Sequence, residues 1–502
     1  MSSSYAGVAL LVTLLAGCVH WNNRRYRRVP PGPPGLPLIG NLLDLPTTCE
    51  WAQYRNWSRE YQSDIIHLNV CGTRIIVLNS LKAVVDLLDK RSAIYSSRIR
   101  MPMFNELMGY GWSFITMPNN DLWKGYRRQF REEFDGEAIR KYHPAIVHST
   151  HEMLRHIVDA PELWAEHICH MVGASILDVT YGIQVQASND PFIARAELVL
   201  ASTIEVLQPG AFLVDAMPIL KYVPAWIPGA GFQVKARNWR AMGVEMLEAP
   251  FAAMKQSIAD GVARPSFCQS RLDNGDDEDL VKKCAGSIYG AGSDTLSSVL
   301  TTFILAMTKF PHMQSRAHAE LDAIIGTGTL PTLANQHSLP YLAAIIKECL
   351  RWGLLAPFAV PHMLTRDDEY EGMFLPGGSL IIPNSWAIAN DEVAYPEPAK
   401  FDPERYLRDG KLDEDVLAPE VFAFGYGRRI CPGRTMASGS AWLAVASLLA
   451  AFNIEKAVDE NGVPVDPPVQ FSPGAIRRPE PFQCKLVPRS DEMREIVLAT
   501  RD

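Results

Sequence analysis

The sequence predicts a mainly α-helical protein with small β-sheets, in which a single large domain follows an N-terminal membrane helix. Apolar residues recur with a helical period along most of the chain, and only short runs such as Ile75–Leu78 and Ser379–Ile382 suit strands. The 502 residues are 47% hydrophobic and 21% charged, which is enough apolar material for a large buried core. Behind the N-terminal region we find no linker, repeat or low-complexity run that would divide the chain further.

Charge and cysteine content exclude several classes of protein. The formal net charge of −8 argues against a general nucleic-acid-binding protein, so we expect no nucleic-acid partner. The nine cysteines are odd in number and show no C-x-x-C spacing, which argues against a disulfide framework and against a zinc site. A reducing compartment is therefore the expected environment.

Residues 1–23 are predicted to form a single transmembrane anchor. Within them Tyr5–Trp21 is uncharged apart from His20, and its length is near the lower limit of about 17 residues for a spanning helix. A cleaved signal peptide or a lipoprotein signal would carry positive charge before the apolar run, but the first five residues have no charged side chain. The arginines at positions 24, 25, 27 and 28 follow the run and favour a cytosolic location for the rest of the chain.

A basic and Pro/Gly-rich hinge is predicted for residues 24–41, followed by a catalytic domain over residues 42–502. The run "PPGPPGLPLIGN" at Pro30–Asn41 cannot be helical and is expected to form a stiff, polyproline-like spacer. Such a spacer suits a catalytic body that is held in a fixed orientation to a bilayer.

The stretch "FGYGRRICPG" at Phe424–Gly433 places one cysteine among three glycines, two arginines and a proline. Cys431 can be a buried thiol, a redox or nucleophilic thiol, or a metal ligand. The glycines allow close approach to a flat group or a positive φ, and the proline removes an amide donor. Free amides of the turn, together with Arg428 and Arg429, are expected to favour the thiolate.

The stretch "AGSDT" lies inside a long, buried helix that is predicted over Lys282–Phe310 and stopped by a proline. A glycine inside a helix, such as Gly292, destabilises the helix by about 1 kcal/mol relative to alanine, so its presence here needs a local explanation. One alternative is a kink in which a side-chain hydroxyl bonds back to a main-chain carbonyl. The other is an opened turn that faces a ligand, with Ala291 and Thr295 on one face and Asp294 beside them, where an alcohol and a carboxylate can relay protons.

Two further stretches carry charge in apolar surroundings. "KECLRW" places Glu348 and Arg351 three residues apart on one helix face, and "FDPERYL" supplies Arg405. Each alone suits a surface ion pair of little energetic value. Together they are expected to form a buried cluster that is costly to break.

The stretches "AGSDT", "ECLR", "FDPERYL" and "FGYGRRICPG", in this order, resemble the cytochrome P-450 superfamily of haem-thiolate monooxygenases. The anchor and the "PPGPPGLP" hinge are similar to those of its microsomal members. The sequence most resembles fungal, especially mushroom, enzymes that oxidise secondary metabolites, including the tryptamine hydroxylase type. The resemblance implies the cytochrome P-450 fold and a single-pass protein of the endoplasmic reticulum membrane with its catalytic domain in the cytosol.

The resemblance also implies a haem b site. Cys431 would be the axial thiolate ligand of the iron, and a thiolate favours cleavage of the O–O bond. Phe424 would pack on the sulfur side, and the loop glycines would let the loop lie close to the porphyrin. The propionates would bind tryptophan, arginine and histidine side chains. The implied cofactor-binding residues are Trp123, Arg127, His362, Phe424, Arg429, Cys431 and Gly433.

The implied reaction inserts one oxygen atom of O2 into a substrate, with two electrons from NADPH delivered by an NADPH-cytochrome reductase. Asp294 and Thr295 would serve as the catalytic proton donors. The basic stripe of Lys124, Arg128 and Arg131 either faces the reductase or is merely a set of solvated charges. The implied substrate contacts are Phe104, Ile115, Phe212, Ala291, Phe358 and Val360. They suit a lipophilic terpenoid, polyketide or aromatic alkaloid, although any protein core contains such residues.

Two rival functions remain open on the sequence. One keeps the haem thiolate but loses oxygen activation, as in an isomerase or dehydratase, and the presence of Asp294 and Thr295 argues against it. The other discards haem and makes Cys431 a nucleophile, for which no partner pattern is evident. The segment Tyr222–Phe232 has large apolar residues among prolines and glycines, which suits either a lid that dips into a bilayer or a buried turn.

Overall fold

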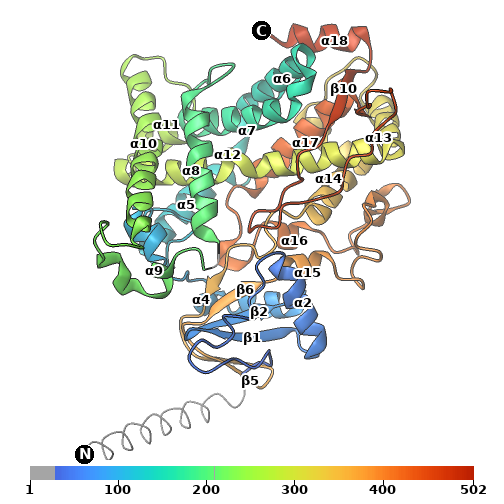
Figure 1. Ribbon diagram of the computed structural model, residues 1–502. Helices are drawn as coiled ribbons and strands as arrows, with labels where there is room; N and C mark the ends of the chain where they lie inside the picture. Colours follow the sequence, from blue (N-terminus) through green and yellow to red (C-terminus); the bar gives the residue numbers. More distant parts are fainter. Residues whose placement is uncertain (1–28, 209, 502) are drawn as a thin grey trace, which may run out of the picture. The chain divides into compact units, whose positions relative to one another are not determined.

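A computed structural model describes residues 29–208 and 210–501 of the chain (Figure 1). The predicted anchor, residues 1–23, and the arginines that follow it lie outside the described residues. Within the described part, no helix has both the length and the apolar character needed to cross a bilayer. The described chain forms two compact units, a smaller one from residues 29–99 with Pro361–Asn384, and a larger one from Arg100–Val360 with residues 385–501.

The smaller unit is built on a four-stranded sheet in the order β1-β2-β6-β3. β1 and β2 are antiparallel, with Ile65 opposite Leu78, whereas β2 and β6 are parallel, with Ile75 opposite Leu380. The two predicted strands are thus confirmed and lie side by side. The elements of this unit are α2 (Glu50–Glu60), β1 (Ile65–Val70), β2 (Thr73–Leu78), α3 (Leu81–Val84), η1 (Val85–Lys90), α4 (Ser92–Tyr95), β3 (His362–Met363), β4 (Asp368–Tyr370), β5 (Met373–Leu375) and β6 (Leu380–Pro383).

The larger unit is mainly helical, as predicted, with two small antiparallel sheets, β9-β10 and β7-β8. Its longer elements are α5 (Asp121–Phe134), α6 (His143–Asp159), α7 (Trp164–Tyr181), α8 (Pro191–Leu207), α10 (Gly231–Ala259), α12 (Glu278–Lys309), α13 (Pro311–Ile324), α14 (Pro340–Trp352), α17 (Arg434–Ala451), β9 (Phe452–Lys456) and β10 (Cys484–Pro488). Its shorter elements are η2 (Pro102–Leu107), η3 (Ala138–Tyr142), η4 (Pro161–Leu163), α9 (Leu213–Ala216), η5 (Pro218–Tyr222), α11 (Phe267–Asp273), η6 (Leu333–Ser338), α15 (Ser385–Ala389), η7 (Pro403–Tyr406), β7 (Leu407–Arg408), β8 (Lys411–Leu412), α16 (Glu420–Ala423), η8 (Gly427–Arg429), α18 (Asp491–Leu498) and η9 (Ala499–Arg501).

Side-chain caps fix the start of α5 and α12, two helices that carry predicted site residues. The Asn120 side chain accepts a hydrogen bond from the amide of Trp123 at the start of α5, at 2.9 Å. The Asp277 side chain accepts one from Leu280 at the start of α12, at 2.8 Å. Such caps satisfy amides that have no partner within the helix, so they set the position at which each helix begins.

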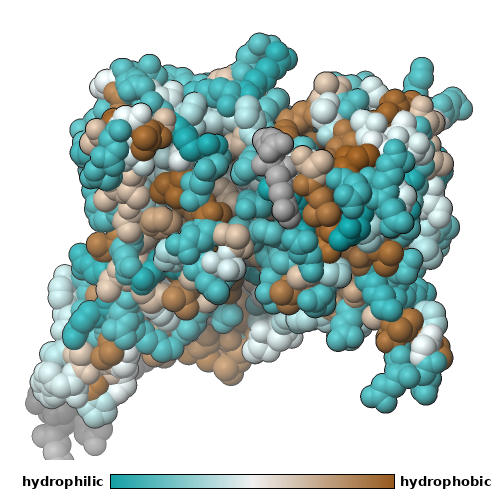
Figure 2. Space-filling model, turned by 90° about the horizontal axis from the view of Figure 1, so that it is seen from above, coloured by the Kyte–Doolittle hydropathy of each residue, from teal (hydrophilic) through white to brown (hydrophobic). Residues whose placement is uncertain are grey.

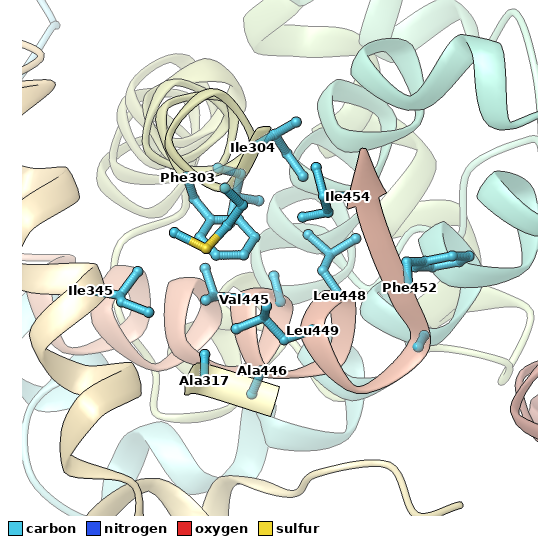
Figure 3. Close-up of a cluster of buried hydrophobic side chains, with 14 of the residues drawn as sticks. Phe303, Ile304, Ala317, Ile345, Val445, Ala446, Leu448, Leu449, Phe452 and Ile454 are labelled. Carbon is cyan, nitrogen blue, oxygen red and sulfur yellow. The ribbon is translucent and has the colours of Figure 1, made fainter. Parts of the chain in front are cut away.

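The core of the larger unit holds α17 in place behind the cysteine loop. Figure 3 shows side chains of α17, such as Val445 and Leu448, packed toward Phe303 of α12 and Ile454 of β9. Full burial of an aliphatic or aromatic side chain contributes about 1.5–3 kcal/mol. The loop that contains Cys431 is therefore attached to a helix that packing strongly immobilises.

The face drawn in Figure 2 is mainly hydrophilic, with hydrophobic side chains in small groups between the charged ones. Scattered surface apolar residues are normal for a soluble domain and need no special function. The segment that precedes α10 is different, because Tyr222 and Trp226 are 71% and 81% exposed.

Candidate active site

The cysteine loop, Phe424–Gly433, contains the short turn η8 and leads into α17, and its backbone is neither an α-helix nor a strand, as predicted. The amide of Cys431 donates a hydrogen bond to the carbonyl oxygen of Phe424, at 2.8 Å. Gly425 and Gly427 have φ values of 75° and 54°, in the left-handed region that side chains disfavour. This turn holds Cys431 at the end of the loop, directly before the helix.

Burial raises the pKa of the Cys431 thiol, while the amide of Gly433 and the guanidinium groups of Arg127 and Arg434 act in the opposite direction. Burial is the largest of these effects, so the sulfur carries a proton at neutral pH when no metal ion binds it. The predicted effect of a loop amide is present at Gly433, whereas the charge effects of Arg428 and Arg429 on the sulfur stay a prediction. The two arginines that lower the pKa of Cys431 come from α5 and α17.

Helix α5 brings two predicted site residues to the cysteine loop. The Arg127 guanidinium donates to the carbonyl oxygen of Ile430, the residue before Cys431, with Nη1 and O 2.5 Å apart. Trp123 is buried, and its Nε1 atom is a buried donor without a hydrogen-bond partner among the described residues. A buried donor without a partner is costly, which marks this atom as a binding position.

Arg429 completes this group of side chains. Its guanidinium carbon lies 4.2 Å from the ring centroid of Trp123, and its Nη2 atom donates to the carbonyl oxygen of Met117 at 2.7 Å. Burial, followed by the nearby charge of Arg127, lowers the pKa of Arg429 to about 9. Two cations that are partly removed from water and close enough to repel each other favour an anionic ligand.

On α12 the structure corrects one prediction. The helix is continuous from Glu278 to Lys309, so the predicted opened turn at Gly292 is wrong. The back-bond of the other alternative is present, because the Thr295 hydroxyl donates to the carbonyl oxygen of Ala291 at 3.3 Å, and the kink stays a prediction. A Cβ atom on Gly292 would lie 2.5 Å from Cδ1 of Ile176, so the glycine is explained by the close packing of α12 on α7.

Ala291 and Thr295 are exposed on one face of α12, four residues apart, although most of the following helix is buried. An exposed hydroxyl at this position is available to a ligand. The side chain of Asp294, the other predicted proton donor, lies outside what the structure describes.

The predicted substrate contacts fall on different parts of the larger unit. Phe104 is buried in η2, with its ring stacked on that of Tyr110 at a centroid distance of 4.7 Å. Phe212 is half-buried at the start of α9, with its ring edge-on to Trp239 at 6.0 Å. The remaining three, besides Ala291, are half-buried or exposed: Ile115, Phe358 and Val360.

His362 belongs to the smaller unit, where it lies in β3 and is 2% exposed. Its Nδ1 atom is 2.7 Å from the carbonyl oxygen of Tyr95. Its role as a third propionate contact stays a prediction. Phe424 is half-buried in the larger unit.

The predicted Glu348 cluster is confirmed. Both Glu348 and Arg351 are 0% exposed, and their closest atoms, Oε1 and Nη2, lie 2.6 Å apart. Arg405 Nε approaches the same oxygen at 3.3 Å. Arg351 also donates to main-chain carbonyls of Ala389 and Pro398, which ties α14 to the segment between α15 and η7.

Two residues that contribute to the site were not predicted from the sequence. Phe114 stacks on Trp123 with centroids 5.6 Å apart and planes inclined by 10°, and Arg434 acts on the cysteine sulfur. Arg434 follows the loop motif directly and its charge was a usable signal. Nothing in the local pattern around Phe114 distinguishes it from other buried aromatic residues.

The family is established by comparison with known proteins. The model of the Cytochrome P450 family matches residues 30–486, so the chain belongs to this family. It is 44% identical over 501 residues to tryptamine 4-monooxygenase of Psilocybe cyanescens, with 97% of this chain and 99% of that protein covered. It is 42% identical to cytochrome P450 monooxygenase 98 of Postia placenta, with 98% and 96% covered, and 40% identical to cytochrome P450 monooxygenase ple1 of Rhodocybe pseudopiperita, with the same coverage.

The relatives are fungal monooxygenases, and the chain is accordingly a haem-dependent monooxygenase with a role in secondary metabolism. The described residues fit the haem that the family implies. A single cysteine sulfur, rather than a cluster of ligands, is what an axial thiolate requires. The unpartnered Nε1 of Trp123 and the buried guanidinium groups of Arg127 and Arg429 suit the two propionates.

Proposed function

We propose that the protein is a membrane-anchored monooxygenase that inserts one oxygen atom of O2 into a lipophilic small molecule. The observation that carries the proposal is the convergence of Trp123, Arg127 and Arg429 on the loop of Cys431. This arrangement brings one sulfur ligand and several hydrogen-bond donors for carboxylates close together in space. It suits a haem and has no evident use in a thiol nucleophile.

Cys431 would hold the iron, with its proton displaced when the metal binds. The bound haem supplies the activation of O2 and the transfer of one oxygen atom, which protein side chains cannot perform. Arg127, Arg429 and Trp123 would donate hydrogen bonds to its propionates. Neutralising those carboxylates also relieves the repulsion between the two arginines.

The chain would contribute protons through α12. Thr295 is exposed, and its hydroxyl donates a long hydrogen bond to the carbonyl oxygen of Ala291. Because this bond is weak, the hydroxyl can rotate and donate to a ligand instead. We propose that Thr295 passes protons to the reacting oxygen and that Asp294 resupplies them. Phe104 and Phe212 would hold an apolar substrate by contact, together with the other predicted lining residues.

The electrons would come from NADPH through a cytochrome reductase that docks on α5. Lys124, Arg128 and Arg131 are all exposed, and Lys124 is paired with Asp121 at 2.8 Å. Arg428 of the cysteine loop is exposed as well. A basic surface that lies close to the sulfur suits an acidic partner.

We place the protein on the endoplasmic reticulum membrane, with the anchor in the bilayer and the body in the cytosol. The exposed rings of Tyr222 and Trp226 support a second contact with the bilayer, because such rings favour the membrane interface. The substrate would then enter from a lipid phase. Among the lipophilic candidates, an aromatic alkaloid gains support from the relative named for tryptamine.

The proposal is tested with the purified protein and with Cys431→Ala. The reduced wild-type protein is expected to give the absorption spectrum of a haem thiolate under carbon monoxide, and to consume NADPH and O2 when reductase and substrate are added. Cys431→Ala is expected to lose the thiolate spectrum, since no other side chain of the loop supplies an anionic sulfur. A variant that kept this spectrum would refute the ligand assignment, and a wild-type protein that turned over substrate without O2 would refute the monooxygenase assignment.

A further inference from the structure

A single carboxylate joins two segments that carry predicted substrate contacts. Asp215 lies in α9, three residues after Phe212, and its own amide donates to the carbonyl oxygen of Phe212 at 3.1 Å. Its Oδ1 atom accepts a hydrogen bond from the amide of Met103 at 2.8 Å, and Met103 is the neighbour of Phe104 in η2. The hydrogen bond therefore ties α9, which begins directly after Phe212, to the backbone of η2 next to Phe104.

Aromatic side chains pack on the two segments that this hydrogen bond joins. Besides Phe104 and Phe212, the rings of Tyr110 and Trp239 pack against the same two segments. Asp215 is half-buried, and burial raises its pKa to about 6, with the Met103 amide opposing and Glu106 adding to the shift. At neutral pH most molecules therefore carry a poorly hydrated negative charge at this position.

Within residues 29–208 and 210–501, no side chain neutralises this charge. The nearby cations Lys221 and Arg100 are both engaged by Glu106, at 2.8 Å and 2.6 Å. Among the described residues, no lysine, arginine or histidine side chain forms an ion pair with Asp215. A partly buried carboxylate without a counter-ion is unfavourable unless a ligand supplies the cation.

We infer that Asp215 binds the ammonium group of a cationic aromatic amine, with Phe104 and Phe212 in contact with its ring system. Asp215 is then a specificity-determining residue. The inference rests on the monooxygenase function proposed above and narrows its lipophilic substrates to arylalkylamines. An ammonium ion donates a charge-assisted hydrogen bond to the carboxylate and is also attracted to the faces of aromatic rings.

The test compares two probes of the same shape, tryptamine, which is a cation at neutral pH, and indole-3-ethanol, which is neutral. Their affinities for the haem-loaded wild-type protein, Asp215→Asn and Glu205→Gln are measured by isothermal titration calorimetry at pH 7.5. Asparagine keeps the acceptor for the Met103 amide and removes only the charge. Glu205→Gln also removes one negative charge, but Glu205 is a surface residue paired with exposed Lys235 at 2.6 Å.

The wild-type protein is expected to bind tryptamine at least about tenfold more tightly than the alcohol, since hydrogen bonds to charged groups are the strong ones. Asp215→Asn is expected to lose that preference through weaker tryptamine binding, while Glu205→Gln keeps it. Wild-type affinity for tryptamine should fall as the pH drops through about 6, because the carboxylate becomes protonated, and the Asp215→Asn profile should be flatter.

Three results would overturn the inference. The first is a wild-type protein that does not prefer the amine, and the second is an unchanged tryptamine affinity in Asp215→Asn. The third is an equal loss of affinity for both probes in Asp215→Asn. The last would show that Asp215 only holds α9 against η2. Selective amine binding without any O2 consumption in the presence of reductase would support Asp215 as an amine site and refute the proposed function, so the two failures are distinguishable.

Discussion

Replacing Glu348 with alanine is expected to destabilise the larger unit more than any comparable change on the surface of α14. Both Glu348 oxygens accept hydrogen bonds from Arg351, at 2.6 and 2.8 Å, and Oε1 also accepts the amide of Asp402 at 2.9 Å. The substitution leaves the fully buried guanidinium of Arg351 without its counter-ion. Breaking such a pair from one side costs about 3–5 kcal/mol.

The magnitude can be checked by urea unfolding of Glu348→Ala, with Lys347→Ala as the matched control. Lys347 precedes Glu348 on the same helix and also makes an ion pair, with Glu420 at 2.8 Å, but its side chain is 21% exposed and that of Glu420 is 40% exposed. An exposed pair contributes about 0–1 kcal/mol, so the control should unfold close to the wild-type protein. The difference corresponds to a factor of at least about 30 in the unfolding equilibrium.

The interpretation of the cluster would be refuted if Glu348→Ala and Lys347→Ala lost the same small free energy of unfolding. Equal values would mean that water reaches Arg351 after the substitution and replaces the lost carboxylate. Haem content, measured on the same samples, adds a second readout, because loosening α14 and the segment before η7 is expected to reduce the yield of haem-loaded protein.

Two further predictions concern turnover. Thr295→Ala is expected to retain haem but to consume NADPH while releasing peroxide, because the proton path loses its exposed hydroxyl. The measurement is the amount of product formed per NADPH consumed. An unchanged ratio would remove Thr295 from the mechanism. The double variant Arg128→Glu and Arg131→Glu is expected to slow reductase-supported turnover and to leave haem content and peroxide-supported turnover intact, since both exposed side chains lie in the proposed docking surface. For the wild-type protein the association rate with reductase should fall as salt rises, because exposed charges are screened beyond about 10 Å at 0.1 M. Reductase-supported turnover that was the same in the charge-reversed and wild-type proteins at low and moderate salt would rule out this docking surface.

Several features of the protein followed from the sequence alone, because they depend on spacing along the chain. Glu348 and Arg351 lie three residues apart, which places them on one helix face wherever the helix lies. Gly425 and Gly427 have left-handed backbone angles, which the glycine-rich motif allows, and the strand signal at 75–78 marks a strand. Local sterics and the helical period fix such features before any tertiary contact is made.

Tertiary packing decided which residues meet. The Oδ1 atom of Asp215 bonds to a residue 112 positions away, and Arg127 reaches Ile430 across 303 positions. Gly292 is a second example. The local pattern suggested an opened turn as one explanation of the glycine, whereas the structure explains it by the close approach of Ile176 from another helix. Contacts between distant segments depend on how whole faces of helices fit together, and that fit is set by the shapes of many side chains at once. A local motif therefore points to Cys431 as the proposed ligand, but only the folded chain shows that Arg127 and Arg429 lie close to its loop.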